Sequence, residues 1–255
     1  MEEPPAYGTF HLIAIGLTVL LTLVLCVFAR DAKDKTYRRI LFVIWLVMFL
    51  MEGIKQLSQS YSFAADGSLV WSYYWGSFPF QLCDGPLYLL LPIALLPDGK
   101  VRTALSAYMS TYIVLGGVAT YIWINTTLCN SVYVNVQTSV HHGLQIVSGI
   151  FIAVHNRKDW SLKTFLGAFL VFLVAVGIAT GLNVWIHTIV SYTVNMFFIS
   201  PYFRLEVQFL NDAWQSLHWT QALGLYVVGV SALAFVIYLI YMLLFRITRP
   251  AKARE

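Results

Sequence analysis

The sequence predicts an all-α, polytopic membrane protein with seven transmembrane helices, and composition is the first reason. Of the 255 residues, 59% are apolar, whereas a soluble domain has about 45–50%. Charged residues make up 11%, against about 25% in soluble proteins. So few charges cannot cover a soluble domain of this length, which excludes the soluble, disordered and collagen-like classes. No stretch outside the apolar segments is long enough to fold separately, so we expect one domain over residues 1–255.

Seven apolar segments are the second reason. A helix needs about 20 mainly apolar residues to cross a bilayer. We predict spans at about 9–29, 40–58, 79–97, 101–124, 138–156, 164–189 and 218–245. The third and fifth are shorter and more polar than the others, which indicates a functional role. The first eight residues carry two acids and no Lys or Arg, so we expect the first span to stay in the protein.

The basic residues predict the orientation of these spans. Fourteen of the 16 Lys and Arg follow the first, third, fifth or seventh span: Arg30, Lys33, Lys35, Arg38, Arg39, Lys100, Arg102, Arg157, Lys158, Lys163, Arg246, Arg249, Lys252 and Arg254. Arg204 lies in an opposite loop, and Lys55 lies inside the second span. By the positive-inside rule the N-terminus lies outside and the C-terminus in the cytoplasm, which requires an odd number of spans. The net charge of +4 therefore reflects topology and is no sign of nucleic-acid binding.

This topology brings the polar residues of five spans to one depth, that of the outer leaflet. An ionisable group at the centre of a membrane helix costs roughly 2.5–3.5 kcal/mol, so such groups indicate function by default. The polar residues concerned are Glu52, Lys55, Gln56, Gln81, Cys83, Asp84, His141, His142, Gln145, Asn183, His187 and His218. Asn195 follows in the loop at 190–217, which is too apolar for a free loop, so we expect part of it to re-enter or lie at the interface.

Two of these groups have structural alternatives that the sequence leaves open. Glu52 and Lys55 are three residues apart on one helix face, where they can simply neutralise one another. Asn183 and His187 are four residues apart and can serve as hydrogen bonds between helices.

Cys83 has an unusual neighbourhood at the start of the third span. Pro79, Gly85 and Pro86 surround it, and Pro86 has no N–H, so we expect the Leu82 carbonyl to be free. A helix that begins near Pro86 would place Cys83 at its positive end, which favours a thiolate. Asp84 opposes that effect unless it turns away or pairs.

Cys83 and the two other cysteines, Cys26 and Cys129, show neither the spacing of a metal site nor that of a disulfide framework.

A reactive cysteine needs a base, and His141 and His142 open the fifth span. They are about 100° apart on a helix, so at most one can face Cys83 squarely. A Cys–His pair suits acyl transfer through a thioester.

Three segments carry a family resemblance. "WSYYWGSFPFQLCDGPLYL" (71–89), "HHGLQIVSG" (141–149) and "VNMFFISPY" (194–202) resemble the YwaF/TP0381 family of bacterial integral membrane proteins, with the TMEM164 family a more distant relative. The resemblance implies a six- or seven-helix fold shared with the membrane hydrolases called androgen-induced proteins. It also implies a multi-pass protein of the bacterial cytoplasmic membrane, with membrane phospholipids or fatty esters as its partners and no cofactor.

The resemblance assigns roles to the Cys–His pair. In TMEM164 such a pair is assigned to phospholipid acyl transfer, and in the related hydrolases a threonine–histidine pair cleaves fatty esters. Carried over, the nucleophile is Cys83 and the base is one of His141 and His142. His142 is favoured because it precedes a small residue, here Gly143, as the hydrolase histidine does. Asp84 matches no role in the family.

Two other functions remain open at this point. A zinc hydrolase would use His141 or His142, His187, His218 and Asp84 as ligands, but the His-x-x-x-His pair expected on the last helix is missing. A transporter or sensor would bind its ligand without turnover, and polar groups gathered at one depth argue against a pathway through the membrane.

Overall fold

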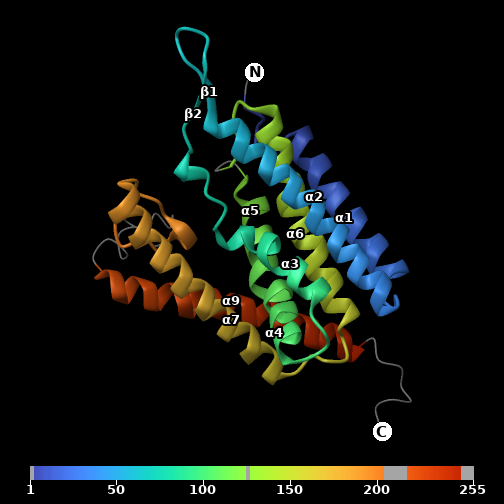
Figure 1. The fold of residues 1–255 in the computed structure, drawn as a ribbon. Helices are drawn as coiled ribbons and strands as arrows, with labels where there is room; N and C mark the ends of the chain where they lie inside the picture. The colour runs from blue at the N-terminus through green and yellow to red at the C-terminus, as the bar shows by residue number, and fades with distance from the viewer. Residues whose placement is uncertain (1–2, 125–126, 204–216, 248–255) are drawn as a thin grey trace.

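The computed structural model describes residues 3–124, 127–203 and 217–247, and in these ranges the chain is almost entirely helical (Figure 1). The helices are α1 (Thr9–Phe28), α2 (Asp34–Ser60), α3 (Gly85–Leu95), α4 (Lys100–Tyr108), α5 (Val114–Ile122), α6 (Val132–His155), α7 (Leu162–Trp185) and α9 (Trp219–Ile247). Two π-helical turns are η3 (Met109–Ile113), which joins α4 to α5, and η5 (Ile186–Val190), which extends α7. Strands β1 (Tyr61–Phe63) and β2 (Leu69–Trp71) form an antiparallel hairpin.

Helical segments lie within all seven predicted spans, and five of them are long and apolar enough to cross a membrane. These five are α1, α2, α4 continued through α5, α7 with its π-turn, and α9. The chain is therefore a multi-pass membrane protein. The other two segments are α3, which is short, and α6, which is more polar, as the sequence indicated for the third and fifth spans.

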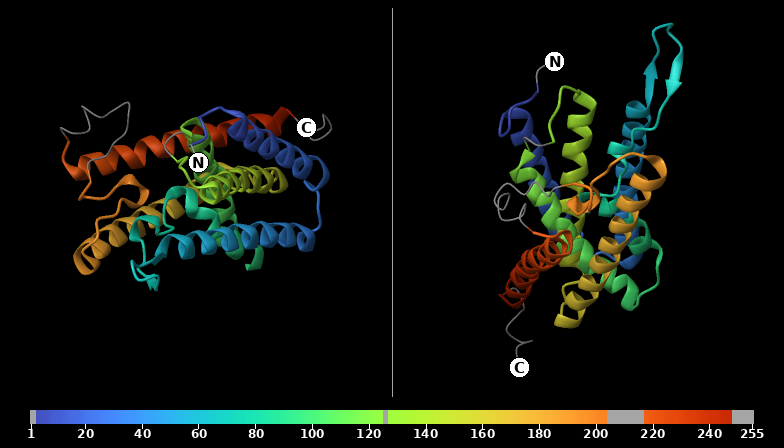
Figure 2. Two further views of the ribbon diagram at one scale, coloured as in Figure 1. Left: turned by 90° about the horizontal axis from the view of Figure 1, so that it is seen from above. Right: turned by 90° about the vertical axis from the view of Figure 1, so that its left-hand side faces the viewer.

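Helices α1 to α7 run alternately up and down the bundle, whereas α9 lies across its lower part (Figure 1). The hairpin projects from the end of the bundle at which α1 begins, and α7 lies on the other side of α4 and α5 from α1 and α2 (Figure 2). The outer faces are apolar: Leu17 of α1 is 60% exposed and Val228 of α9 is 67% exposed. Such faces are stable only against lipid, which fits the membrane assignment.

Helix α6 lies inside the bundle, and glycines allow its neighbours to approach closely. A Cβ atom on Gly143 would lie 2.6 Å from Thr18 Oγ1 of α1. A Cβ atom on Gly149 would collide with Val114 Cγ2 and lie 2.8 Å from the Met109 carbonyl oxygen. Small residues at helix contacts are the usual means of close packing in membranes.

Ion pairs join the helices at the end of the bundle away from the hairpin. Arg102 pairs with Asp34 at 3.1 Å and with Asp98, and Arg157 pairs with Asp31. These arginines belong to the set that we predicted to be cytoplasmic. Three other members of that set, Arg249, Lys252 and Arg254, lie outside the described residues, as does Arg204 of the opposite loop.

The segment after α7 is packed inwards rather than free. Val194, Met196 and Ile199 are buried, and the short 3₁₀ turn η6 (Met196–Phe198) lies against α7. The prediction that part of this loop is not free is confirmed for residues 194–200, most of which are buried. Residues 204–216 of the loop lie outside the described residues.

Candidate active site

Cys83 lies in a tight turn that leads into a helix. The 3₁₀ turn η2 (Leu82–Asp84) runs directly into α3, and Pro86 occupies the first turn of that helix, as predicted. The Asp84 carboxylate closes the turn by accepting the Gln81 backbone N–H at 2.6 Å. Cys83 is therefore held beside the positive end of the α3 dipole, where a negative charge is stabilised.

His141 reaches this turn from α6 and contacts the main chain of Cys83. The Gly85 N–H donates to the Leu82 oxygen, so the expectation that Pro86 frees the Leu82 carbonyl is wrong. The carbonyl left free is instead that of Cys83, because Pro86 has no N–H to donate to it. His141 Nε2–H donates to that oxygen at 3.0 Å. Because a carbonyl oxygen can only accept, this contact leaves the lone pair of the neutral ring on Nδ1.

Asp84 connects the Cys83 turn to His141. Its Oδ1 atom lies 3.7 Å from His141 Nε2, while Oδ2 holds the turn. His141 is 4% exposed, and its Nδ1 atom has no hydrogen-bond partner among the described residues. Asp84, for which the sequence indicated no role, thus caps the turn and faces the His141 imidazole.

His142 is anchored separately, one residue along α6. Its Nδ1–H donates to the Thr138 oxygen at 2.7 Å, which leaves the lone pair on Nε2. The two imidazole rings are 5.5 Å apart between centroids, with an interplanar angle of 62°. Within the described part of the chain, the Cys83 thiol forms no hydrogen bond to either ring. Both rings are buried and held in place, and each keeps one basic nitrogen.

A chain of amide contacts fixes the Cys83 turn to α7. Gln81 donates from Nε2 to the Asn195 oxygen at 2.9 Å and accepts the Phe197 N–H at 2.7 Å. Asn183 of α7 holds the next backbone position in the same way, with its side chain bonded to both the N–H and the oxygen of Met196. Asn183 therefore serves as a hydrogen-bonding clamp between segments, the alternative that the sequence left open.

A second polar cluster surrounds Glu52 on α2. Lys55 Nζ lies 2.8 Å from Glu52 Oε1, so the predicted pairing on one helix face is confirmed. Gln56 also donates to Oε1 at 2.6 Å, and Gln137 of α6 donates to Oε2 at 2.9 Å. Glu52 is 4% exposed, and its carboxylate is fully satisfied. Gln137 therefore connects this cluster to α6, the helix that carries His141.

Gln145 closes the site from α6. Its Nε2 donates to the Ile113 oxygen in the π-turn η3 at 2.5 Å. The same side chain lies beside Gly116, where an added Cβ would be 3.2 Å from Nε2 and 3.8 Å from the Cys83 nitrogen. A side chain at position 116 would therefore press on Gln145, while its contact with the Cys83 nitrogen would be an ordinary van der Waals contact.

Two histidines that were grouped with the site lie apart from it. His187 bonds Thr193 at 3.1 Å and stacks on Tyr202, and His218 is exposed and bonds Thr220. Across residues 3–124, 127–203 and 217–247, no three His, Cys, Asp or Glu side chains gather as metal ligands. The ligand set of the zinc alternative is therefore not assembled.

Sequence reasoning missed Gln137, Tyr73 and Tyr133 around the Glu52 cluster. Tyr73 donates to Gln56 Oε1 at 2.8 Å, and Tyr133 donates to the Met51 oxygen at 2.6 Å. Gln137 could have been found, because it precedes His141 by one helical turn and so shares its face. The tyrosines gave no such signal, since interfacial tyrosines are common in membrane proteins.

Comparison with known proteins identifies the family of the chain. No curated protein and no solved structure matches the chain. The sequence model of the TMEM164 family matches residues 6–242, which include every helix up to most of α9. The chain therefore belongs to the TMEM164 family.

Proposed function

We propose that this protein is a membrane-embedded acyltransferase or acyl hydrolase that acts on lipid esters. The observation that carries the proposal is the contact of His141 with the Cys83 turn, beside a second anchored histidine. A nucleophile, two imidazoles and a helix N-terminus meet there among buried groups. The chain belongs to the TMEM164 family, and the same chemistry is what the sequence resemblance implies.

The reaction would take place in two transfers of the acyl group. The base removes the Cys83 proton, and sulfur attacks the ester carbonyl carbon. The carbon–oxygen bond of the ester breaks, the leaving lysolipid oxygen takes the proton from the base, and the acyl group stays on sulfur as a thioester. A hydroxyl of a lysolipid or of water then attacks the thioester and gives its proton to the base, which restores the thiol. No cofactor is needed at any step.

We assign different roles to the two histidines. His142 has its Nδ1–H on Thr138 and its Nε2 lone pair free, the orientation of a general base. His141 gives its Nε2–H to the Cys83 carbonyl and so positions the nucleophile turn. The Cys83 thiol must turn towards His142 when substrate binds, because catalytic hydrogen bonds often form only in the substrate complex.

Lys55 is the group best suited to stabilise negative charge on the substrate. Its ammonium has three donors, and Glu52 uses one of them. Two other donors, the Asn183 amide and the Gly85 N–H, are already bonded to backbone oxygens. We place the site at outer-leaflet depth of a bacterial cytoplasmic membrane, following the basic residues and the YwaF-like motifs.

Lipid turnover by the purified protein tests the proposal. Protein in nanodiscs would receive phosphatidylcholine with a labelled acyl chain, either alone or with an unlabelled lysolipid. Labelled fatty acid in the first case and labelled new phospholipid in the second distinguish hydrolase from transferase. Cys83→Ala should reduce both products to background, because the thioester cannot form.

The matched control is Cys26→Ala, since Cys26 is a partly exposed thiol of α1. It should retain the activity of the unmodified protein. Turnover that survives in Cys83→Ala at the rate of the Cys26→Ala control would refute the assignment of the nucleophile.

A further inference from the structure

A polar cavity of about 350 Å³ lies at the far end of α3 from Cys83. It is bounded by α4 and the start of the π-turn η3, the end of α6 with the loop that follows, and the start of α7. Asp98, three residues beyond α3, lines it, and the 11 residues of α3 rise about 16 Å. The cavity is therefore separate from the candidate active site, and its volume is typical of sites for small molecules.

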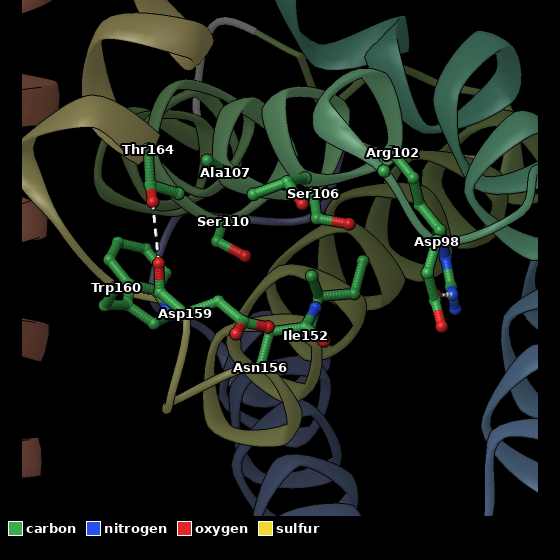
Figure 3. Close-up of a pocket in the computed structure, with 12 residues that line it drawn as sticks. Asp98, Arg102, Ser106, Ala107, Ser110, Ile152, Asn156, Asp159, Trp160 and Thr164 are labelled. Atoms are coloured by element: carbon green, nitrogen blue, oxygen red, sulfur yellow. Dashed lines mark hydrogen bonds and ion pairs between the residues drawn. The ribbon is translucent and has the colours of Figure 1, made fainter.

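A buried hydroxyl in this cavity has no partner. Ser110 is 0% exposed, it lines the cavity, and its Oγ atom forms no hydrogen bond with any described residue. Figure 3 shows Ser110 and Asp159 both extending into the space between Trp160 and Ser106. Leaving a buried hydroxyl without a hydrogen bond costs about 1–3 kcal/mol. A bound molecule that forms a hydrogen bond with the Ser110 hydroxyl would therefore be stabilised.

The strongest donors around the cavity are already used. Arg102 donates from Nε to the Ile93 oxygen at 3.0 Å, and its two terminal nitrogens pair with Asp34 and Asp98. The Trp160 Nε1–H donates to the Ala153 oxygen at 3.1 Å. The guanidinium is therefore neutralised and has little affinity left for an anion.

Besides the Ser110 hydroxyl, two free groups of the cavity can only accept hydrogen bonds. The Asp159 carboxylate lines the cavity without an ion pair or a side-chain hydrogen bond to the described residues. Asn156 uses its Nδ2 on the Tyr37 hydroxyl at 3.3 Å, which leaves Oδ1 to accept. Arg157, next in the same loop, is paired with Asp31 instead of Asp159. The cavity lining thus carries two carboxylates against one guanidinium.

We propose that this cavity binds a small organic ammonium ion that also carries a hydroxyl group. The ammonium would donate to Asp159 and to Asn156 Oδ1, and the hydroxyl would bond Ser110 Oγ. The Trp160 ring in the cavity wall adds an aromatic surface suited to cations. A free amine and the ammonium headgroup of a lipid share this chemistry. With the predicted orientation, the cavity opens towards the cytoplasm.

Titration with ethanolammonium tests this site. The full chain in phosphatidylglycerol nanodiscs would be titrated by calorimetry, and we expect saturable binding of one ion per protein. Asp159→Asn should weaken binding about tenfold or more, since a hydrogen bond to a charged group is lost. Ser110→Ala should weaken it less. Asp66→Asn, in the exposed hairpin, is the matched control and should bind like the unmodified protein.

Three further arms make the result decisive. Neutral propylene glycol should not bind, and Cys83→Ala should bind normally, so failure of the proposed enzyme leaves this test intact. Nanodiscs that also contain phosphatidylethanolamine separate the sources: competition identifies the lipid headgroup, and its absence identifies a free amine. The proposal is overturned if no saturable binding occurs, if Asp159→Asn binds as tightly while melting at the same temperature, or if glycerol phosphate binds in place of ethanolammonium.

Discussion

Helices α1 and α6 pack against each other and are similar in length, but α1 buries few of its side chains and α6 buries most of its own. Of the 20 residues of α1, all described, two are buried, His11 and Thr18. Of the 24 residues of α6, 15 are buried, and eight of those are polar. Helix α1 has the hydropathy of a membrane-crossing helix, and α6 does not reach it. The difference teaches that polar side chains can lie at membrane depth where other helices of the protein, rather than lipid, surround them.

The histidines of α6 give the sharpest test of this contrast. His142→Gln should lower lipid turnover about 100-fold, because a general base contributes roughly 10²–10⁴-fold to the rate. His141→Gln should retain more activity, since the glutamine amide still carries an N–H for the Cys83 carbonyl. Initial rates of acyl transfer in nanodiscs measure both.

The opposite ranking of these two variants would reassign the base to His141. Equal rates for both variants and the unmodified protein would mean that the buried polar face of α6 is structural. His218→Gln, at an exposed position away from the site, is the control for loss of an imidazole.

Removal of Glu52 tests whether the buried face of α6 depends on its partner in α2. Glu52→Ala leaves Lys55 and the Gln137 amide without their carboxylate, and breaking a buried ion pair costs about 3 kcal/mol. The melting temperature in detergent should fall by several degrees. Glu52→Gln should lose less, because it keeps an acceptor oxygen. If Glu52→Ala has the same melting temperature as the unmodified protein, the cluster contributes nothing to stability.

Gly149 tests the close packing of α6. Gly149→Ala would press a methyl group against Val114 and the Met109 carbonyl, and such overpacking costs about 1–3 kcal/mol. A Cβ atom on Gly177 of α7 would meet no other atom within 4 Å, so Gly177→Ala should be neutral or slightly stabilising. Thermal unfolding of the two variants side by side checks this difference. Equal melting temperatures would show that α6 has room at position 149.

The smallest expected effect on stability comes from the ion pair between Asp31, which follows α1, and Arg157, which follows α6. The hydrogen bond from Arg157 lowers the pKa of Asp31 below its ordinary value of 3.8. A lowered pKa in the folded state means that this stabilisation is present above pH 3.8 and is lost as pH falls through the folded value. Melting temperatures across this acidic range should therefore fall slightly less for Asp31→Asn than for the unmodified protein. Parallel curves would show that the pair contributes nothing measurable.

The sequence predicted the helices well because lipid imposes a simple rule on them. Long apolar segments such as those of α1 and α9 must be helical, since the bilayer offers no partners for backbone groups. Proline chemistry also placed the start of α3 near Pro86, and the helix begins one residue earlier, at Gly85. The assignment of the free carbonyl to Leu82 was wrong, because the chain enters α3 through a 3₁₀ turn, whose hydrogen bonds span three residues rather than four.

The site was predicted in part, for reasons of geometry. Residues within one helical turn, such as Glu52 and Lys55, were paired correctly. Contacts between distant segments, such as Gln81 with Asn195, depend on packing that periodicity does not describe. His187 was grouped with the site from its depth alone, yet it contacts Thr193 and Tyr202, because depth does not say which way a side chain faces.

The central claim is that Cys83 carries the acyl group between donor and acceptor. The most direct measurement is mass spectrometry of the protein after brief incubation with a phospholipid donor and no acceptor, followed by acid quench. The account predicts a peptide containing Cys83 that is heavier by one acyl group, loses it with hydroxylamine, and is absent in His142→Gln. Turnover of the donor with Cys83 unmodified throughout would contradict the account.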